Sequence, residues 1–360
     1  MSADAQPSAP TSAQPSAQPS EQTPVPPHPR ASGTGPWPGT DPLEALRTVL
    51  GELSGDLGVP FLPELPARGP GADPVGRAAG LLVELPVDLQ PMGWRLVDHP
   101  GRDASRTHGL WSVDTDALAE AADGYAGPLK LQVVGPWTLA ANVFLPRAER
   151  AVVDAGATRD LFASLAQGIA DHVALVRRQV PGAQVLLQLD EPGLPAVLEG
   201  RLPTASGWGR LPAVDPQRAR DALRDLLDAV DVPVVIRCAS ARAPLGLLRE
   251  VRPAGLSVDV ASLTSAGRES LATAVEAGVA PWVGVLDPAA DANSPLPPVA
   301  AVVEQLTRPW HEVGLDPASL APAVLTPAGG LSQLSAARAR GVLRRLREAA
   351  DAVTEVASGA

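Results

Sequence analysis

Positions 186–193 carry Leu186-Leu187-Gln188-Leu189-Asp190-Glu191-Pro192-Gly193, and the architecture of the chain is best deduced outward from this segment. An apolar run ends there abruptly in two acids and a proline. A short apolar run bounded by Pro and Gly predicts a buried strand. Carboxylates directly after such a strand lie where α/β proteins keep their chemistry. Asp190 and Glu191 are therefore the first candidates for a functional site.

Similar apolar runs recur along the chain and alternate with segments of helical periodicity. We predict strands at 61–65, 129–134, 184–190, 232–238, 255–260, 281–286 and 322–326, with a further strand or loop opening at 33–37. Helices are predicted at 158–179, 216–230 and 333–356, the last with Ser335 as its N-cap. This alternation is typical of βα units and a parallel sheet.

The number of units favours a closed (β/α)8 TIM barrel, an α/β fold, over an open doubly wound sheet. No dinucleotide-type glycine fingerprint follows the first strand, because Gly33 and Gly35 alone are a weak match. We expect the barrel to span residues 33–356. Residues 87–128 fit the repeat poorly, since they contain Trp94, Trp111 and many turn residues. We interpret them as an insertion packed near one mouth of the barrel.

Residues 1–30 consist mainly of Ser, Ala, Gln and Pro and are predicted to be a disordered tail. They lack the pattern of a targeting signal, and no later window is apolar enough to span a membrane. The only cysteine, Cys238, excludes an internal disulfide and fits a reducing compartment. The formal net charge of -11 argues against nucleic-acid binding. We expect a cytoplasmic protein that acts on a small molecule.

A barrel builds its site from the residues at the carboxyl ends of its strands. Here these residues are Gly35-Pro36-Trp37, Gly135-Pro136-Trp137, Asp190-Glu191-Pro192, Arg237-Cys238-Ala239, Asp259, Asp287 and Thr326-Pro327-Ala328-Gly329-Gly330.

Taken in order, these segments resemble the cobalamin-independent methionine synthase family, specifically its carboxyl-terminal barrel and short actinobacterial homologues. The resemblance covers roughly residues 33–345. Residues 35–40 are similar to the family's Ile-Gly-Ser-aromatic-Pro opening, 135–139 to Gly-Pro-Val-Thr-Ile, and 188–192 to Gln-Ile-Asp-Glu-Pro. The resemblance implies a methyltransferase of methionine biosynthesis. Its reaction would move a methyl group from a methyltetrahydrofolate-type donor to homocysteine or a related thiol.

The resemblance also implies roles for individual residues. Asp190 would bind the amino group of homocysteine through a charge-assisted hydrogen bond. Glu191, Gly35, Trp37 and Trp137 are further candidates for substrate binding. The alternatives are that the two acids cap the following turn or helix and that the tryptophans pack in the core. The family's serine after Gly35 is a proline here, which offers neither a hydroxyl nor an N–H to a substrate carboxylate.

The family's zinc ligands are largely missing from this chain. By resemblance, Arg237 and Ala239 take the places of a His and a Cys, Gly329 takes the place of the last Cys, and Asp259 matches an acid. Moving the alignment by one residue gains Cys238 but puts isoleucine on the histidine. A catalytic zinc needs at least three protein ligands. We therefore predict that zinc is absent or weakly bound.

Three strand-end residues are candidates for catalysis. Arg237 at a half-buried mouth needs an acidic partner, and we predict that it pairs with Asp259. Asp287 is the remaining acid of a family segment whose histidine is missing near 293–295. Cys238 alternates with Arg237 along the strand and is expected to face the helices as a buried thiol.

Three functions remain open at this level. The first is an S-methyltransferase related to methionine synthase. The second is a non-catalytic barrel that binds an amino acid or thioether, that is, a pseudoenzyme. The third is a metal-free enzyme of the uroporphyrinogen decarboxylase type. Arg237 is the one residue that supports this third function.

Overall fold

A computed structural model gives the structure of the chain and describes residues 28–147, 149–288 and 294–359. The predicted disordered tail lies outside the described residues as far as position 27. Its last residue, Arg30, already begins the first strand.

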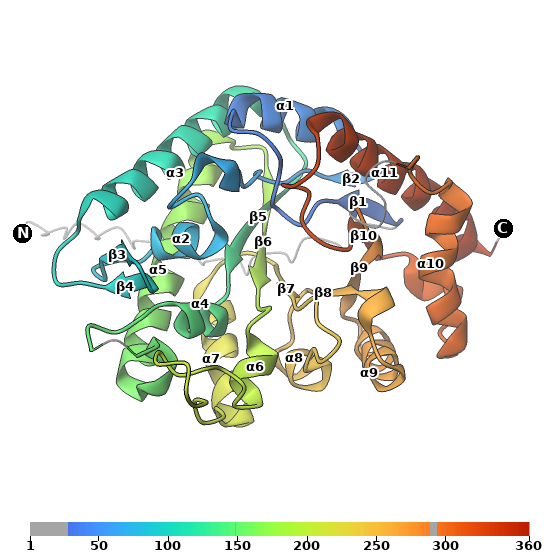
Figure 1. Cartoon of the computed structure of the whole chain (residues 1–360). Helices are drawn as coiled ribbons and strands as arrows, with labels where there is room; N and C mark the ends of the chain where they lie inside the picture. The colour runs from blue at the N-terminus through green and yellow to red at the C-terminus, as the bar shows by residue number, and fades with distance from the viewer. Residues whose placement is uncertain (1–27, 148, 289–293, 360) are drawn as a thin grey trace, which may run out of the picture.

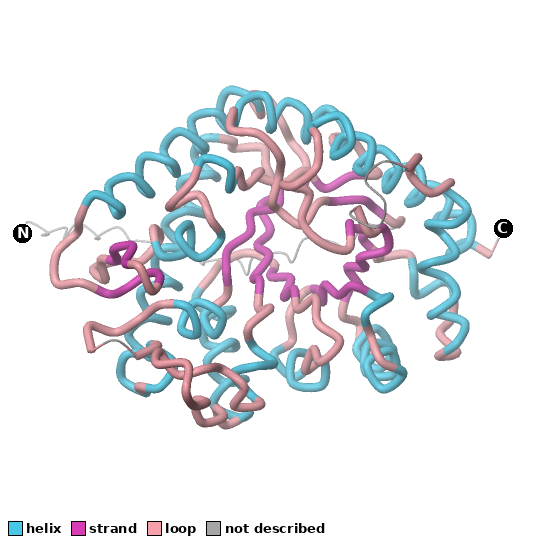
Figure 2. Tube along the Cα trace, viewed as in Figure 1, coloured by secondary structure: helices cyan, strands magenta, loops and turns pink. Residues whose placement is uncertain are grey.

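Eight parallel strands form one sheet that curves into a ring at the centre of the molecule (Figures 1 and 2). The strands are β1 (Arg30–Ser32), β2 (Gly58–Val59), β5 (Pro128–Val134), β6 (Gln184–Asp190), β7 (Val234–Arg237), β8 (Gly255–Asp259), β9 (Ala280–Leu286) and β10 (Val324–Pro327). Lys130 N donates to Pro60 O at 2.8 Å, and Leu62 N donates to Lys130 O at 3.0 Å. These bonds join the segment after β2 to β5, so the sheet closes into the predicted barrel.

Long helices surround this ring and alternate with its strands. They are α1 (Pro42–Leu53), α3 (Arg102–Ala121), α5 (Ala155–Gln179), α7 (Pro216–Ala229), α8 (Leu245–Val251), α9 (Ser265–Glu276), α10 (Val299–Glu312) and α11 (Ala336–Ser358). Shorter pieces lie in the loops: α2 (Pro74–Ala79), α4 (Pro136–Asn142), α6 (Leu194–Leu198) and the 3-10 helices η1 (Pro66–Arg68), η2 (Ala151–Val153), η3 (Val260–Ser262) and η4 (Pro317–Leu320).

Local sequence signals explain where these helices begin. Asp41 accepts hydrogen bonds from two backbone N–H groups of the first turn of α1, and Pro42 takes the first helical position, where no N–H is needed. Ser335 caps α11 by accepting from Arg338 N, as predicted. Apolar residues spaced three or four apart, such as Leu223 and Leu226 of α7, bury one face of each helix against the sheet.

The predicted elements from residue 129 onward are confirmed to within three residues at each end. The first two strands differ more. β1 ends at Ser32, before the predicted opening at 33–37, and β2 precedes the predicted 61–65. In both predicted segments only isolated bridges form, between Pro36 and Glu64 and between Phe61 and Lys130. Pro36, Pro60 and Pro63 each lack an N–H, so these segments cannot extend a regular ladder.

The interpretation of residues 87–128 as an insertion was too broad. The hairpin of β3 (Val87–Gln90) and β4 (Gly93–Leu96) is an addition to the barrel and forms its own antiparallel sheet. Helix α3, in contrast, packs between α1 and α5 and belongs to the outer layer. Its buried face includes the polar side chains of Thr107, Asp114 and Thr115, which hid the helical period from a search for apolar residues.

Apolar side chains fill both sides of the barrel wall. The main core lies between the strands and the helices. A smaller cluster of Val59, Val235, Trp282 and Val324, with Leu186 beside it, forms an apolar floor inside the ring. Gly255 leaves the room that this floor requires, since a Cβ there would lie 2.8 Å from Trp282 Cδ1.

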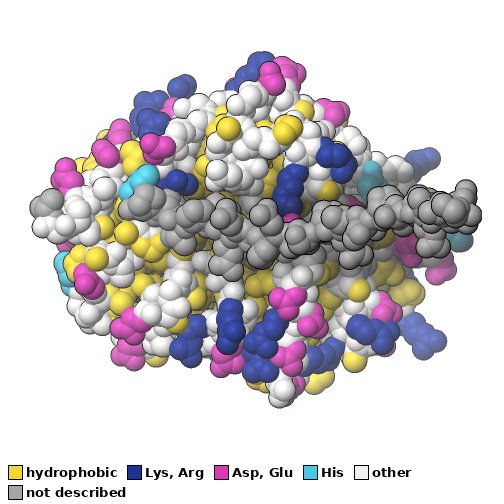
Figure 3. Space-filling model, turned by 180° about the vertical axis from the view of Figure 1, so that it is seen from behind, with side chains coloured by type: hydrophobic (Ala, Val, Ile, Leu, Met, Phe, Trp, Pro, Cys, Tyr) yellow, Lys and Arg dark blue, Asp and Glu magenta, His cyan; other side chains and the backbone are white. Residues whose placement is uncertain are grey.

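No described helix combines the length and the apolar character that crossing a membrane requires. On the face shown in Figure 3, basic and acidic side chains are interspersed.

Candidate active site

Polar side chains line the inside of the barrel above the apolar floor. Strand pairing places them on the same face as Leu186 and Val235 of that floor, because residues two apart on a strand point the same way. They are Lys130 and Gln132 of β5, Gln188 and Asp190 of β6, Arg237 of β7, Ser257 and Asp259 of β8, and Thr326 of β10. The carboxyl end of the barrel is therefore strongly polar.

Asp190 lies at the carboxyl end of β6 and is held by its neighbour Gln188. Gln188 Nε2 donates to Asp190 Oδ1 at 2.8 Å and to Thr34 O at 3.0 Å, which fixes the carboxylate in orientation. No hydrogen bond within the described residues reaches Asp190 Oδ2. Burial raises the pKa of Asp190, against the opposing effects of the positive charges of Arg237 and Lys130. Asp190 is thus an oriented acceptor with one oxygen available.

Arg237 pairs with Asp259, as predicted. Arg237 Nη2 lies 3.4 Å from Asp259 Oδ1, and the two side chains are 14% and 19% exposed. Burial raises the pKa of Asp259, while Arg237 lowers it and the negative charge of Asp287 raises it. Asp287 itself is exposed at the end of β9. A Cβ on Gly284 would lie 2.5 Å from Asp259 Oδ1. The carboxylate therefore fits beside β9 only because position 284 is a glycine.

Two charged residues that the sequence analysis missed also lie in this region. Glu64 is 3% exposed and Lys130 is fully buried. Burial raises the pKa of Glu64 to about 7 and lowers that of Lys130 to about 7. Lys130 Nζ donates to Gln132 Oε1 at 3.3 Å. A usable signal existed: Lys130 is the only lysine of the chain and stands inside an apolar strand.

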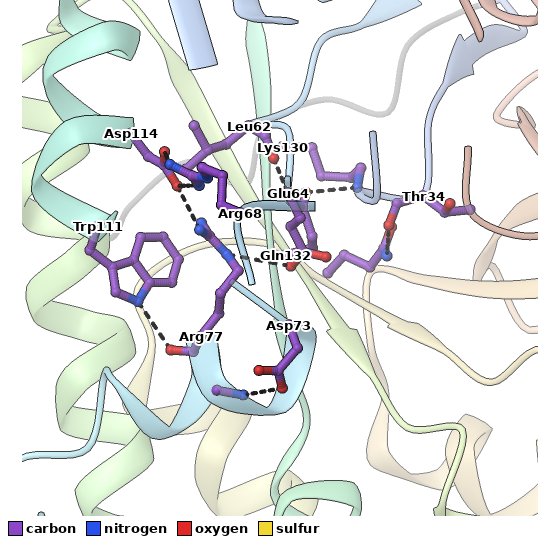
Figure 4. A network of polar contacts seen from close by, with 12 residues as sticks. Thr34, Leu62, Glu64, Arg68, Asp73, Arg77, Trp111, Asp114, Lys130 and Gln132 are labelled. Atoms are coloured by element: carbon purple, nitrogen blue, oxygen red, sulfur yellow. Dashed lines mark hydrogen bonds and ion pairs between the residues drawn. The ribbon is translucent and has the colours of Figure 1, made fainter. Parts of the chain in front are cut away.

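A chain of ion pairs connects Glu64 to the outer helices (Figure 4). Arg77 of α2 lies 3.9 Å from Glu64 Oε1 and 2.6 Å from Asp114 Oδ2 of α3. Arg68 of η1 binds the same Asp114 at 2.7 Å. Trp111 of α3 stacks on the Arg77 guanidinium at 3.8 Å and donates to Arg77 O at 3.0 Å. These contacts hold Arg77 in place, and Arg77 in turn holds Glu64 on the side that faces the helices.

Gly35 lies beside the polar region and contributes backbone alone. Its φ of +123° suits glycine, and a Cβ there would lie 2.8 Å from Gln132 Cγ. Gly35 O accepts from Glu64 N at 3.0 Å. The structure therefore places Gly35 beside Gln132 and Glu64, and its role in substrate binding stays a prediction.

Glu191 points away from the barrel axis, and we remove it from the candidate substrate-binding residues. It is fully buried, and its carboxylate accepts from Trp137 N at 2.9 Å, Thr138 N at 2.8 Å and Thr138 Oγ1 at 2.6 Å. Both oxygens cap the start of α4, an earlier helix of the chain, whereas the alternative for these acids was a cap on the following turn or helix. Alternation along β6 explains the result, since Asp190 and Glu191 must face opposite sides.

The two tryptophans are packed in the core and do not face the polar region. Trp37 is 2% exposed and meets the Phe61 ring edge-on at 6.3 Å. Trp137 is fully buried, donates from Nε1 to Ala219 O at 3.0 Å and packs against Phe162. It borders a cavity of about 600 Å³ between α5 and α7, on the outside of the barrel. The prediction that either ring binds the substrate is therefore withdrawn.

The residues present do not fit the zinc that the resemblance implies. The Arg237 guanidinium, a fixed cation, occupies the position expected for the histidine ligand. Cys238 is fully buried in the core outside the barrel, and burial raises the pKa of its thiol to about 12. Ala239 and Gly329 carry no donor side chain. Among the residues that the structure describes, no group of three His, Cys, Asp or Glu is placed to hold a metal ion.

Comparisons with known proteins agree on the fold. No protein-family model and no curated protein matches the sequence. A B12-independent methionine synthase from Shewanella sp. W3-18-1, solved in complex with selenomethionine, has a TM-score of 0.58 at 12% identity, covering 93% of this chain and 99% of that chain. A methyltransferase from Methanosarcina mazei has a TM-score of 0.55 at 17% identity, covering 91% and 95%. At these identities the likeness shows a shared barrel fold.

Proposed function

We propose that the carboxyl end of the barrel binds a small amino acid of the methionine or homocysteine type. The observation that carries the proposal is Asp190, whose carboxylate is fixed by Gln188 through one oxygen while the other is available. A carboxylate is the natural partner of a ligand ammonium, and such a bond strengthens where water is excluded. The similar methionine synthase in complex with selenomethionine supports this ligand class.

The geometry favours binding without zinc-dependent chemistry. In the family that the sequence resembles, zinc activates the homocysteine thiol, and the described residues include no group of three donors placed to hold that metal. Asp190 remains beside a cationic Arg237, so the site retains an anchor for the amino acid. Its function is therefore that of an amino-acid-binding barrel with the methionine-synthase fold.

S-methyl transfer is the second candidate, with a methyltetrahydrofolate-type donor and homocysteine or a related thiol as acceptor. One feature of the site favours it: the positive charge of Arg237 would lower the pKa of a thiol placed beside it. Tetrapyrrole decarboxylation gains no support, because Arg68 and Arg77 are already paired with Asp114.

Calorimetric titration with L-methionine and L-homocysteine tests the proposal. We expect both ligands to bind the wild-type chain. Asp190→Asn keeps the shape of the side chain and should weaken binding roughly 10- to 100-fold, the value of one hydrogen bond to a charged group. Asp228→Asn, at an exposed acid of α7, is the matched control. Absence of binding to the wild type, or equal affinity in Asp190→Asn, would refute the proposal.

The second candidate has its own assay. Incubation with methyltetrahydrofolate and homocysteine, followed by mass spectrometry, should yield no methionine above a protein-free control. Production of methionine that Arg237→Gln abolishes would instead establish S-methyl transfer in this barrel.

A further inference from the structure

Two donors of the loop after β1, one backbone N–H and one hydroxyl, already have acceptors within the chain. Trp37 N donates to Glu64 O at 2.8 Å. The Thr34 hydroxyl donates to Gly329 O at 2.9 Å. Pro36, between them, has no N–H. Trp37 N, the Thr34 hydroxyl and Pro36 N therefore offer no free donor to an anionic group on the ligand, which directs attention to donors elsewhere in the barrel.

Two donors inside the barrel have no acceptor. Arg237 Nε is buried and makes no hydrogen bond to any part of the chain that the structure describes. The same holds for the hydroxyl of Thr326, a residue that is 1% exposed. An unpaired buried donor is destabilising, which makes each of these groups a place where an acceptor would be stabilised.

A series of contacts links these two donors across the barrel wall, from β7 to β10. Arg237 reaches Asp259 on the next strand, Asp259 pairs in register with Gly284, and Gly284 pairs with Thr326. On the other side, Arg237 is the register partner of Asp190. A cationic donor therefore lies next to the proposed ammonium anchor, on strands about 4.8 Å apart.

The charges around the barrel interior balance. The cationic residues are Arg68, Arg77, Lys130 and Arg237, and the anionic residues are Glu64, Asp114, Asp190 and Asp259. With four residues of each sign, the formal charge is zero. The pKa values of Glu64 and Lys130 both lie at about 7, so the charges of these two residues cancel near that pH. Such a site suits a ligand that is neutral overall but carries separate charges.

We propose that the site takes an α-amino acid as a zwitterion, with its ammonium on Asp190 and its carboxylate on Arg237 Nε and Thr326 Oγ1. This inference rests on the proposed function and adds the second anchor of the same ligand. An α-amino acid carries both charges on one carbon, so its partners must lie on neighbouring strands, as Asp190 and Arg237 do. A phosphate dianion, in contrast, would bring two uncompensated negative charges between Asp190 and Asp259.

Ligand analogues test the carboxylate contact on the wild-type chain. The probes are L-methionine, L-methioninamide, which lacks the carboxylate charge, and 4-(methylthio)butanoic acid, which lacks the ammonium. Titration at about pH 6.5 keeps the α-amino groups protonated. We expect each analogue to bind at least 10-fold more weakly than L-methionine. Equal binding of L-methionine and L-methioninamide would overturn the proposed carboxylate site while leaving the Asp190 anchor intact.

Variants test which residues bind the ammonium of the ligand and which bind its carboxylate. Thr326→Val removes the hydroxyl at constant shape. Arg237→Gln combined with Asp259→Asn removes both charges of the ion pair, so no carboxylate is left unpaired. Both variants should reduce the preference for L-methionine over L-methioninamide and retain the preference over 4-(methylthio)butanoic acid. Asp190→Asn should reduce the preference over 4-(methylthio)butanoic acid and retain the preference over L-methioninamide. Asp228→Asn should change neither preference.

The outcomes separate the two proposals. If L-methionine fails to bind the wild-type chain, the proposed function falls, and this inference with it. If L-methionine binds and Asp190→Asn weakens it, but the double variant and Thr326→Val keep full preference over the amide, this inference alone is refuted. Circular dichroism and thermal melting of each variant show whether it is folded before it is titrated.

Discussion

At the scale of single residues, burial sets the behaviour of the charged groups in this barrel. Glu64 and Lys130 move in opposite directions from their usual pKa values and meet at about 7, because loss of water penalises the charged form of each. Neither group makes a close ion pair with the other among the described contacts. Their protonation states are therefore sensitive to pH in the neutral range.

Lys130 gives a testable dependence of stability on pH. Its pKa falls from 10.5 to about 7 in the folded chain, so between these values the unfolded state binds more protons and stability rises with pH. From pH 7 to pH 9, the free energy of unfolding of the wild type should gain about 2 kcal/mol relative to Lys130→Met, a comparison in which the ionisation of Cys238 is common to both chains. Urea denaturation at both pH values measures this difference. Leu129→Met on the same strand should keep the wild-type slope.

Glu191 is expected to be structural. Glu191→Ala leaves Trp137 N, Thr138 N and the Thr138 hydroxyl without their acceptor and opens a void, so it should lower the free energy of unfolding by about 2–4 kcal/mol. Urea denaturation measures the loss. Glu304→Ala, at an exposed acid of α10, should stay within about 0.5 kcal/mol of the wild type. A loss of ligand affinity in folded Glu191→Ala would restore this residue to the binding site.

The sequence predicts the site best where strand alternation is applied. Arg237 facing Asp259, and Cys238 facing the helices, both follow from it. Applied to β6, the same rule predicts that Glu191 points out of the barrel if Asp190 points into it. Trp37 and Trp137 lie beyond the ends of regular strands, where the turn of the backbone sets the direction of a side chain and no period applies. Glu64 and Lys130 were missed because only strand ends were searched.

At the scale of secondary-structure elements, several strands depend on glycines that make room for a neighbouring side chain. Gly255 accommodates Trp282 of the floor, and Gly284 accommodates the Asp259 carboxylate. Each glycine lies on a barrel strand that faces a bulky or charged partner on the next strand. These pairs adjust the width of the barrel interior locally.

Gly284→Ala tests this dependence. The added Cβ would lie 2.5 Å from Asp259 Oδ1 and 3.0 Å from Ala328 Cα, so the strand or the carboxylate must shift. We expect a loss of about 1–3 kcal/mol in the free energy of unfolding by urea denaturation. Gly109→Ala, in the middle of α3 with open space around it, should instead gain about 0.5–1 kcal/mol. Equal effects of the two substitutions would contradict the crowding seen at Gly284.

Elements were predicted well where their apolar pattern is simple. Strands β5 to β10 are apolar runs and were located from the sequence. β1 and β2 are short and prolines follow them, so their pairing depends on neighbours far away in the chain. Helix α3 buries Asp114 against Arg68 and Arg77, and such a polar contact surface has no apolar period to detect.

At the scale of the whole molecule, the barrel interior consists of the apolar floor and a polar layer above it. The Arg237–Asp259 pair belongs to this layer, and among the described residues no group of three His, Cys, Asp or Glu is placed to hold a metal ion. The barrel class was deduced from the number of βα units. The family resemblance rests on short motifs, and the comparisons extend only to the fold.

Zinc should therefore neither copurify with the chain in a defined amount nor stabilise it. We expect metal analysis to find well below one equivalent, and melting curves with added zinc or EDTA to coincide, because a ligand stabilises a protein only if it binds the folded state. Stoichiometric zinc that is lost in both Cys238→Ser and Asp259→Asn would contradict this expectation.

Cys238 can report the local opening of the barrel wall. It is the only thiol of the chain, lies at the end of β7 and is fully buried. A thiol-specific chromogenic reagent can react with it only after this part of the wall separates from the helices. The labelling rate at increasing reagent concentration therefore measures the rate at which the barrel wall opens at that position. A series of absorbance traces on the unmodified protein would report local opening of the wall at this position.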